Sequence, residues 1–232
     1  MLEFDRPRPK EPPKRVMRYL KATINDGLVY RKVDELRILC YTDADHAGDH
    51  SNRRSTSGMV TFLCIAPISY RAHQQKTVAL STAEAEYVSA TSSVQELIWL
   101  ERFVEELKVP VVGKAYLLCD NPSAIRMIKN PEAHQRTKHI DVRHHFIRDQ
   151  YLERKFEVYF VPTDQQRADL FTKALSAATH NQPNNKLDVY EVISTSQGEC
   201  WSVIRSYNLI DCTPVCSCAS TFLSYFVRCT RI

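Results

Sequence analysis

The order of apolar and polar positions divides the middle of the chain into strands and helices. Short apolar runs between polar turns are typical of buried strands. Five such runs predict strands at 36–41, 59–64, 67–72, 114–120 and 156–162. Apolar positions three and four residues apart predict helices at 13–24, 82–107, 122–129, 137–155 and 163–175. Three strands in succession, followed by strands that alternate with helices, predict an α/β fold with a mixed sheet.

Three of these helices begin at residues with capping chemistry. Ser81 and Glu84 have the spacing of a capping box at the start of the long helix, and Thr163 and Gln166 repeat that spacing at the start of the last one. Asn121, which a proline follows, is a typical N-cap for the helix after the fourth strand. These signals set the expected helix starts to within a residue or two.

The long helix 82–107 carries two glutamates near its start, and its apolar positions distinguish them. Steps of three and four residues from Glu86 pass through the apolar stripe Ala90, Ser93, Leu97, Leu100, Val104 and Leu107. The same steps from Glu84 reach the mostly polar positions Thr91, Gln95, Arg102 and Glu106. We therefore expect Glu86 to face the sheet and Glu84 to lie on the solvent face as a cap. Trp99 is expected in the core.

Acidic residues stand where the predicted strands end. Asp43 closes the first strand with Asp45 in the turn behind it, Asp120 closes the fourth, and Asp169 lies in the first turns of the helix after the fifth. Ligands in open α/β sheets bind at strand ends. With Glu86, four carboxylates would converge there, and they repel one another unless cations neutralise them. Oxygen ligands of this kind suit Mg²⁺, and two such ions can clamp a phosphoryl displacement.

Composition narrows the class of protein without giving its function. Apolar residues make up 44% and charged residues 25% of the 232 residues, which are globular values. The net charge of +4 is compatible with nucleic acid binding but not diagnostic of it. No apolar run reaches the roughly 18 residues of a membrane helix, and the charged, proline-rich stretch 1–15 is unlike a signal peptide. We expect an intracellular protein, cytoplasmic or nuclear, without a membrane partner.

The histidines and the clustered cysteines raise the alternative of a zinc site. His139, His144 and His145 share the predicted helix 137–155, but their spacing matches no zinc-binding helix. A basic helix face that meets nucleic acid is the favoured interpretation of these histidines. Near the end of the chain, three cysteines are a second, weak zinc candidate: Cys212, Cys216 and Cys218.

Uneven cysteine use marks a boundary near residue 180. The periodicity ends there, HNQPNN has the composition of a linker, and five of the eight cysteines lie between 200 and 229. The other three lie in apolar strand contexts, where cysteine behaves as a small buried hydrophobe: Cys40, Cys64 and Cys119. We expect 36–176 to fold as one domain and 181–232 to be poorly ordered, with a strand near KLDVYEVIS as its one regular feature.

Several long motifs resemble a single family. YTDADHAGDHSNRRSTSG, QKTVALSTAEAEYVSA, CDNPSAI, RTKHIDVRHHFIRD and VPTDQQRADLFTKAL are similar, in this order, to the ribonuclease H (RNase H) domain of copia-type LTR retrotransposon Pol polyproteins. The resemblance implies an RNase H-like domain at 36–176, with strands 1–3 antiparallel and strands 1, 4 and 5 parallel. Residues 1–35 are then an arm and a remnant of the reverse transcriptase connection segment, and 177–232 an unrecognised Cys-rich tail.

The resemblance also implies an activity and a site. The family's acidic residues map onto Asp43, Glu86, Asp120 and Asp169, the four that the strand ends and the helical wheel single out. They would hold two Mg²⁺ ions, for which Mn²⁺ substitutes, and cleave the RNA strand of an RNA–DNA hybrid. Glu86 and Asp120 would also help to read the ribose 2′-OH. The further partner implied is the reverse transcriptase domain of a full-length polyprotein, whose palm motifs this sequence does not contain.

Basic and polar residues near these acids are candidates for nucleic acid contact. They are expected to bind phosphate or sugar rather than bases. For the arginines, a solvated loop is the alternative. The candidates are Arg53, Arg54, Lys76, Asn121 and Lys173.

The sequence departs from the family pattern beside the acids. His46 replaces a tryptophan in DADHAG, Pro122 replaces a glutamine in CDNPSAI, and FVPTDQQRAD lacks the loop histidine that cellular RNases H have before the last aspartate. These departures keep open a second function, a catalytically inactive retroelement remnant that at most binds nucleic acid. A third, an integrase-like nuclease on the same fold, is disfavoured because the motifs resemble RNase H instead.

Overall fold

A computed structural model of the chain describes residues 12–24, 26–28, 30, 35–49, 51–130, 141–173, 189–193 and 202–203. The chain divides into two compact units, one formed by 30–188 and the other by 1–29 together with 189–232. All five predicted strands lie in the first of these units.

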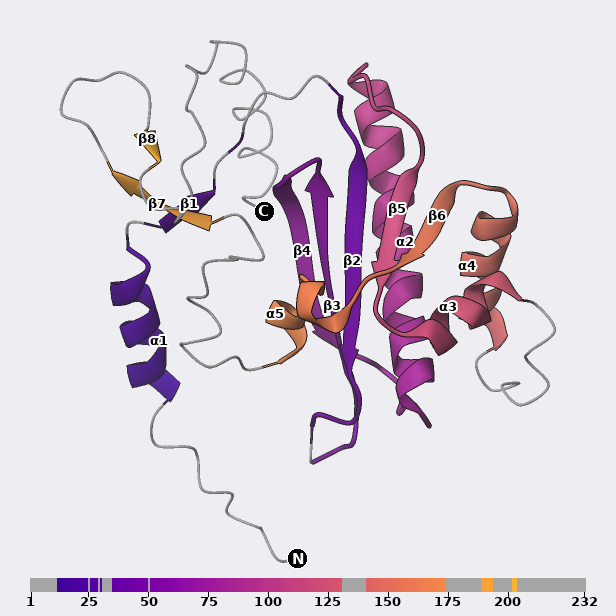
Figure 1. The fold of residues 1–232 in the computed structure, drawn as a ribbon. Coiled ribbons are helices and arrows are strands. Elements are labelled where there is room, and N and C mark those ends of the chain that lie inside the picture. The colour runs from indigo at the N-terminus through magenta and orange to yellow at the C-terminus, as the bar shows by residue number, and fades with distance from the viewer. Residues whose placement is uncertain are drawn as a thin grey trace, which may run out of the picture. The chain divides into compact units, whose positions relative to one another are not determined.

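The larger unit is built on one five-stranded sheet (Figure 1). Its strands are β2 (Ile38–Asp45), β3 (Thr56–Leu63), β4 (Ala66–Gln74), β5 (Ala115–Cys119) and β6 (Phe156–Phe160), in the order β4-β3-β2-β5-β6. The pairs β2–β3 and β3–β4 are antiparallel, and the pairs β2–β5 and β5–β6 are parallel. This is the predicted mixed sheet, with the strand directions that an RNase H-like fold requires.

Side chains of β2 alternate until the strand reaches its acidic end. Ile38, Cys40 and Thr42 are fully buried, whereas Leu39 and Tyr41 between them are only partly covered. The alternation stops at Asp43, which is buried together with the residues on either side. The short helix α5 (Asp169–Thr172) contacts β2 at this point, where the Thr172 hydroxyl donates to Asp43.

Helices flank the sheet and build its core. They are α2 (Thr82–Glu106), α3 (Pro122–Lys129), α4 (Asp141–Leu152) and the short α5 (Asp169–Thr172), which lies in front of the sheet in Figure 1 while α2 passes behind it. Within the described residues, no helix is long and apolar enough to cross a membrane. The core includes Ile38, Met59, Leu97, Leu100, Leu117, Ile128, Ile147 and Phe156.

The predicted start of α2 is correct, and the predicted inward stripe holds from Glu86 to Val104. Ser81 is the N-cap and accepts a hydrogen bond from the Glu84 amide at 3.2 Å. Glu84 does not face solvent, however. It is 7% exposed because its Oε2 folds back to accept a hydrogen bond from the Leu80 amide at 2.8 Å. The capping role is therefore confirmed, and the solvent-facing position was wrong.

The predicted core position of Trp99 was wrong. Trp99 is 52% exposed and stacks on Phe103, with ring centroids 5.4 Å apart. At 3.6 residues per turn Trp99 lies about 100° from Leu100, which puts it outside the buried stripe. Leu107, predicted as the last residue of that stripe, is the exposed C-cap.

The last predicted helix, 163–175, begins later than its capping signal suggests. Thr163–Gln165 is a single 3-10 turn without a side-chain cap, and α5 starts only at Asp169. Gln166 is fully buried instead of capping the turn, because its Nε2 donates to the Thr42 carbonyl at 2.9 Å. The capping-box prediction for Thr163 and Gln166 was wrong, and the described part of this segment ends at Lys173.

The smaller unit combines both ends of the chain. It contains α1 (Pro12–Ala22), β1 (Asp26–Leu28), β7 (Val189–Ile193) and β8 (Ser202–Val203). The strands form a sheet in the order β1-β7-β8, in which β7 is antiparallel to both neighbours. β7 coincides with the expected KLDVYEVIS strand. The rest of 181–232, including the candidate zinc cysteines, lies outside the described residues.

Candidate metal centre

Four acidic side chains from four elements meet at one edge of the large sheet. Asp43 belongs to β2, Asp120 follows β5 directly, Glu86 lies in the second turn of α2, and Asp169 opens α5. β2 and β5 are parallel, so their acidic ends are adjacent. The structure thus brings together all four residues that the sequence singles out.

Asp43 lies at the centre of this cluster. It is 1% exposed, and its Oδ2 accepts a hydrogen bond from the Thr172 hydroxyl. Burial raises the pKa of Asp43, and the charges of Asp169 and Asp120 raise it further, whereas Thr172 and Lys173 oppose the shift. The carboxylate is therefore held in place by α5 and needs positive charge nearby to stay ionised.

Glu86 is the most strongly perturbed acid of the cluster. Burial raises the pKa of Glu86 to about 9, with further contributions from the charges of Asp43 and Asp120. Its side chain is 7% exposed, and its Oε2 is buried without a hydrogen-bond partner among the described residues. A buried carboxylate oxygen that lacks a partner is costly in a folded protein, and a bound cation would satisfy it.

Neighbouring side chains hold Asp120 and Asp169. The Thr163 hydroxyl donates to Asp120 Oδ2 at 3.0 Å, and the Lys173 ammonium lies 2.7 Å from Asp169 Oδ1. Asp120 is the more solvent-accessible of the two, whereas Asp169 is buried. Both carboxylates are therefore held in place at the sheet edge.

Lys173 supplies positive charge to the cluster. Its Nζ also lies 3.4 Å from Asp43 Oδ2, so that it bridges Asp43 and Asp169. Burial alone would lower the pKa of Lys173, but the hydrogen bond to Asp169 and the charges of both aspartates raise it above its ordinary value. A phosphate contact for Lys173 stays a prediction, because in this structure its ammonium binds carboxylates.

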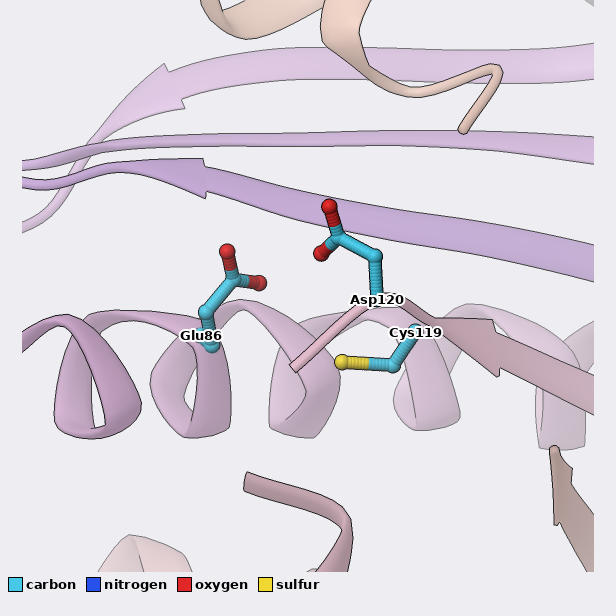
Figure 2. Close-up of side chains that lie close together, drawn as sticks. All are labelled: Glu86, Cys119 and Asp120. Atoms are coloured by element: carbon cyan, nitrogen blue, oxygen red, sulfur yellow. The ribbon is translucent and has the colours of Figure 1, made fainter. Parts of the chain in front are cut away.

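A cysteine that the sequence analysis placed in the core also lies in this cluster. Cys119 is fully buried, as expected, but one ligand atom from each of Glu86, Cys119 and Asp120 lies within 4.8 Å of the others (Figure 2). Side chains alternate along a strand, so Cys119 and Asp120 would normally point to opposite faces. Asp120 lies one residue beyond the end of β5, and both side chains reach the same space.

The donor set fits divalent cations. Carboxylate oxygens are the ligands that Mg²⁺ and Mn²⁺ prefer, and a cluster of buried carboxylates requires neutralisation. The unpartnered Glu86 Oε2 is the observation in this structure that favours such an ion. Asp43, Glu86, Asp120 and Asp169 are thus the residues that could hold it.

Buried polar residues anchor the elements that carry these acids. Gln166, in the segment before α5, donates from Nε2 to the Thr42 carbonyl and accepts from the Ala168 amide through Oε1 at 3.2 Å. Ser89 of α2 donates to the Asp43 carbonyl at 2.8 Å. Helices α2 and α5 are therefore both tied to β2 within one residue of Asp43.

Substituting Gln166 by leucine is expected to destabilise the domain. Leucine has a similar volume but leaves the buried Thr42 carbonyl and the Ala168 amide without these bonds, at about 1–3 kcal/mol for each group left unpaired. Urea denaturation should show the loss in the free energy of unfolding. Gln165→Leu is the matched control, since Gln165 is exposed and its change should stay within about 0.5 kcal/mol. Equal stability of the two variants would contradict the anchoring role.

The predicted nucleic acid contacts lie at the same sheet edge. The loop between β2 and β3 carries Arg53 and Arg54, both exposed, and is organised by Asp49, whose carboxylate accepts from Ser51 and Gln74. These hydrogen bonds lower the pKa of Asp49 to about 2. Lys76 is exposed just after β4.

Asn121 has the structural role predicted for it. Its Oδ1 accepts hydrogen bonds from the amides of Ser123 and Ala124, which makes it the N-cap of α3 with Pro122 in the first turn. This confirms the predicted helix start. Contact with nucleic acid is left to its side-chain amide and stays a prediction.

The structure describes one of the histidines that the sequence analysis singled out. At the position where the family has tryptophan, His46 lies with its Nε2 3.2 Å from the Ala79 carbonyl, which links the turn after β2 to the segment before α2. His139 lies outside the described residues, and so do the side chains of His144 and His145, so the zinc alternative for them is not addressed by the structure.

Comparison with known proteins identifies relatives by sequence. No family model matches the chain. The Pol polyprotein of transposon TNT 1-94 from Nicotiana tabacum is 41% identical over 175 residues, which is 75% of this chain and 12% of that protein. The Pol polyprotein of transposon RE1 from Arabidopsis thaliana is 37% identical over 179 residues, 77% of this chain and again 12% of the relative. The chain therefore spans about an eighth of the length of these relatives.

Solved structures of RNases H are also similar at low identity. LC11-RNase H1, crystallised in complex with an RNA/DNA hybrid, is 16% identical, with a TM-score of 0.44 over 58% of this chain and 93% of that one. The fold class follows from the strand order and directions, and the sequence relatives supply the family. Over three quarters of its length, this chain is thus a homologue of the copia-type retrotransposon Pol polyproteins that its motifs resemble.

Proposed function

We propose that this chain is a retrotransposon-derived ribonuclease H that hydrolyses the RNA strand of an RNA–DNA hybrid in a metal-dependent reaction. The observation that carries the proposal is the convergence of Asp43, Glu86, Asp120 and Asp169 at one sheet edge. Glu86 Oε2 is buried there and has no hydrogen-bond partner in the part of the chain that the structure describes. Homology to retrotransposon Pol polyproteins supports an origin in such an element. The RNase H motifs of the sequence favour an RNase H over other nucleases on a similar fold.

The four acids would hold two Mg²⁺ ions, or Mn²⁺ in their place. Divalent ions held in this way supply an activated water for in-line attack on the phosphate and stabilise the leaving 3′ oxygen. Asp43, the most buried of the four, would be shared between the two positions. Glu86 and Asp120 would serve the leaving-group side, and Asp169 would serve the water side.

Neighbouring residues orient these carboxylates before substrate binds. The Thr172 hydroxyl holds Asp43 and the Thr163 hydroxyl holds Asp120, so neither side chain has to reorganise. Preorganised carboxylates lower the free energy needed to assemble the reacting groups. The Lys173 ammonium offsets the negative charge between Asp43 and Asp169 until cations arrive.

A hybrid with a chimeric strand tests the substrate class. We expect the protein to cleave the RNA strand in Mg²⁺, and a short run of deoxyribonucleotides placed within that strand to remain uncut because it lacks the 2′-OH. Cleavage products resolved to single nucleotides provide the measurement. Equal cleavage within the deoxyribonucleotide run would indicate a nuclease that does not read the sugar. A hybrid that is bound but never cut would favour the inactive remnant.

Hybrid binding is expected to be sensitive to salt through the loop between β2 and β3. Each phosphate contact contributes about 0.7–0.9 to the slope of log K against log salt concentration. Substituting both Arg53 and Arg54 by glutamine should therefore reduce the slope by up to about twice that amount. Fluorescence anisotropy over a range of salt concentrations measures it. Arg102→Gln is the control, since Arg102 lies exposed on α2 roughly 24 Å along the helix from Glu86.

The outcome of that comparison decides whether the loop contacts phosphate. A slope unchanged by the double substitution, or reduced equally by Arg102→Gln, would show that these arginines are only part of a solvated loop. A binding constant independent of salt would show that phosphate contacts are not the main contribution to binding.

A further inference from the structure

The acid cluster contains one atom that does not suit magnesium. The Sγ of Cys119 shares a space with the carboxylates of Glu86 and Asp120, and one ligand atom of each lies within 4.8 Å of the other two. Figure 2 shows Cys119 projecting beside Asp120 toward the helix that carries Glu86. The cysteine approaches from β5 and the glutamate from α2, so the three donors surround a common point from two elements.

A second observation indicates that this point is missing a ligand. Only 7% of the surface of Glu86 is exposed. Its Oε2 has no hydrogen-bond partner among the described residues. Its carboxylate is one of the three groups that converge. The carboxylate with the unpartnered oxygen therefore belongs to the same cluster as the thiol.

A site with sulfur and oxygen donors prefers a different ion from the one that a site made of carboxylates alone prefers. Mg²⁺ binds oxygen and does not recruit sulfur, whereas thiolates favour softer ions such as Zn²⁺. Bond lengths of about 2.3 Å to sulfur and 2.0–2.2 Å to oxygen allow one ion to bridge these atoms after small side-chain rotations. Cd²⁺ has the same preference for sulfur and reports on it spectroscopically.

We propose that Glu86, Cys119 and Asp120 form a binding site for a single thiophilic divalent cation, Zn²⁺ or Cd²⁺. The ion would be held by Sγ of Cys119 and by one carboxylate oxygen from each acid. Water would complete its coordination, since Asp120 is partly accessible to solvent.

Binding at this site displaces the proton of the Cys119 thiol. The metal–sulfur bond forms as the S–H bond breaks, and the proton passes to water. The Asn121 amide, whose nitrogen lies 3.4 Å from Sγ, donates to the sulfur and favours the thiolate that results.

Occupation of this site has a consequence for the reaction. Glu86 and Asp120 are the acids assigned above to the leaving-group side, so an ion bound to Cys119 excludes Mg²⁺ from them. Thiophilic ions should therefore inhibit cleavage. This consequence rests on the proposed function, whereas binding of the ion does not.

Cadmium absorption tests the binding itself. Full-length protein is prepared with serine in place of the five distal cysteines, Cys200, Cys212, Cys216, Cys218 and Cys229. Cd²⁺ is titrated into this parent and into its Cys119→Ala and Cys40→Ala derivatives, and the ultraviolet thiolate-to-cadmium charge-transfer band is recorded. Cys40 is the matched control because it is also fully buried and lies on the adjacent strand β2.

The parent and Cys40→Ala should bind one Cd²⁺ with the charge-transfer band. Cys119→Ala should lose the band and bind at least about tenfold more weakly, since even residues that only support a ligand change metal affinity by about 10–100-fold. Should the alanine variant fail to fold, Cys119→Ser provides the same comparison. A parent without the band, or a band that persists unchanged in both Cys119 variants, would overturn the proposal.

Inhibition by Cd²⁺ separates this proposal from the proposed function. With Mg²⁺ present, the Cd²⁺ concentration for half-inhibition should rise at least about tenfold in Cys119→Ser, with each protein compared with its own uninhibited rate. Unchanged sensitivity in that variant would refute competition at this site. If the parent shows the cadmium band but never cleaves a hybrid, the site stands and the proposed ribonuclease function fails.

Discussion

Replacing Glu86 by glutamine is expected to abolish cleavage of an RNA–DNA hybrid while the domain still folds. Glutamine keeps the shape and helix propensity of glutamate but is a weaker, neutral ligand for a divalent ion. The cleavage rate in Mg²⁺ should fall at least about 100-fold. Initial rates on a labelled hybrid measure the loss, and Asp43→Asn should show a loss of similar size.

The stability of the same variant should change in the opposite direction. Burial and neighbouring acids raise the pKa of Glu86 to about 9. At neutral pH Glu86 is therefore ionised in the unfolded chain and protonated in the folded one, so folding requires the uptake of a proton. A raised carboxyl pKa therefore destabilises the folded protein above the ordinary pKa of glutamate. Glutamine removes this penalty, and the melting temperature in EDTA should be equal to or higher than that of the wild type.

Thermal melts in Mg²⁺ complete the comparison. An ion that binds only the folded state stabilises the protein by RT ln(1 + [L]/Kd), so the wild type should gain stability and Glu86→Gln should gain less. Glu84→Gln is the matched control two residues away. Its side chain accepts a hydrogen bond from Leu80 and glutamine retains such an oxygen, so activity should remain near that of the wild type. An inactive Glu84→Gln beside an active Glu86→Gln would contradict the assignment of Glu86.

Substituting Gly58 by alanine is expected to displace α5 and disable the site without touching an acid. Gly58 pairs with Asp43 across β2 and β3, and α5 packs directly on it. A Cβ at this position would lie 2.6 Å from Thr172 Cγ2, 3.0 Å from Phe171 Cβ and 3.2 Å from the Ala168 carbonyl oxygen. Overpacking of this kind lowers the free energy of unfolding by about 1–3 kcal/mol. Asp169 should move away from Asp43, and cleavage should fall at least about tenfold.

A second substitution tests whether the clash is the cause. Thr172→Ser removes Cγ2, the atom nearest to the added methyl group, but keeps the hydroxyl that donates to Asp43. The double variant Gly58→Ala/Thr172→Ser should therefore regain part of the stability and activity that Gly58→Ala loses. Stability is measured by urea denaturation and activity by hybrid cleavage. If Thr172→Ser brings no recovery, the contact with Thr172 Cγ2 is not the cause of the defect.

Regular periodicity explains why so much of this fold could be predicted. Five apolar runs predicted all five strands of the large sheet. The inward stripe of α2 predicted the orientation of Glu86, because burial on one face constrains every third or fourth residue. The strand ends and the helical wheel singled out the four acids, and the family motifs mapped onto the same residues and implied the strand directions. The errors lie where local chemistry competes with periodicity. Glu84 folds back onto Leu80, and Gln166 binds the Thr42 carbonyl instead of capping a helix.

Residues that complete the site left weaker signals in the sequence. Cys119 looked like a core residue because strand alternation separates it from Asp120, and only the end of β5 brings both to one space. Thr172 and Lys173 contact Asp43 from more than a hundred positions away, a relation that no local pattern encodes. Gly58 acquires its importance from its register opposite Asp43. Such contacts depend on packing between distant segments, which the spacing of residue types does not determine.

Cleavage of a doubly labelled hybrid is the most direct test of metal-dependent RNase H activity. The wild-type protein is incubated with an RNA–DNA hybrid that carries a different label on each strand, in Mg²⁺ and in EDTA. We expect fragments of the RNA strand with free 3′-hydroxyl ends in Mg²⁺, no fragments in EDTA, and an intact DNA strand in both. Cleavage that persists in EDTA, or an RNA strand that stays whole in both Mg²⁺ and Mn²⁺, would contradict a metal-dependent ribonuclease H built on Asp43, Glu86, Asp120 and Asp169.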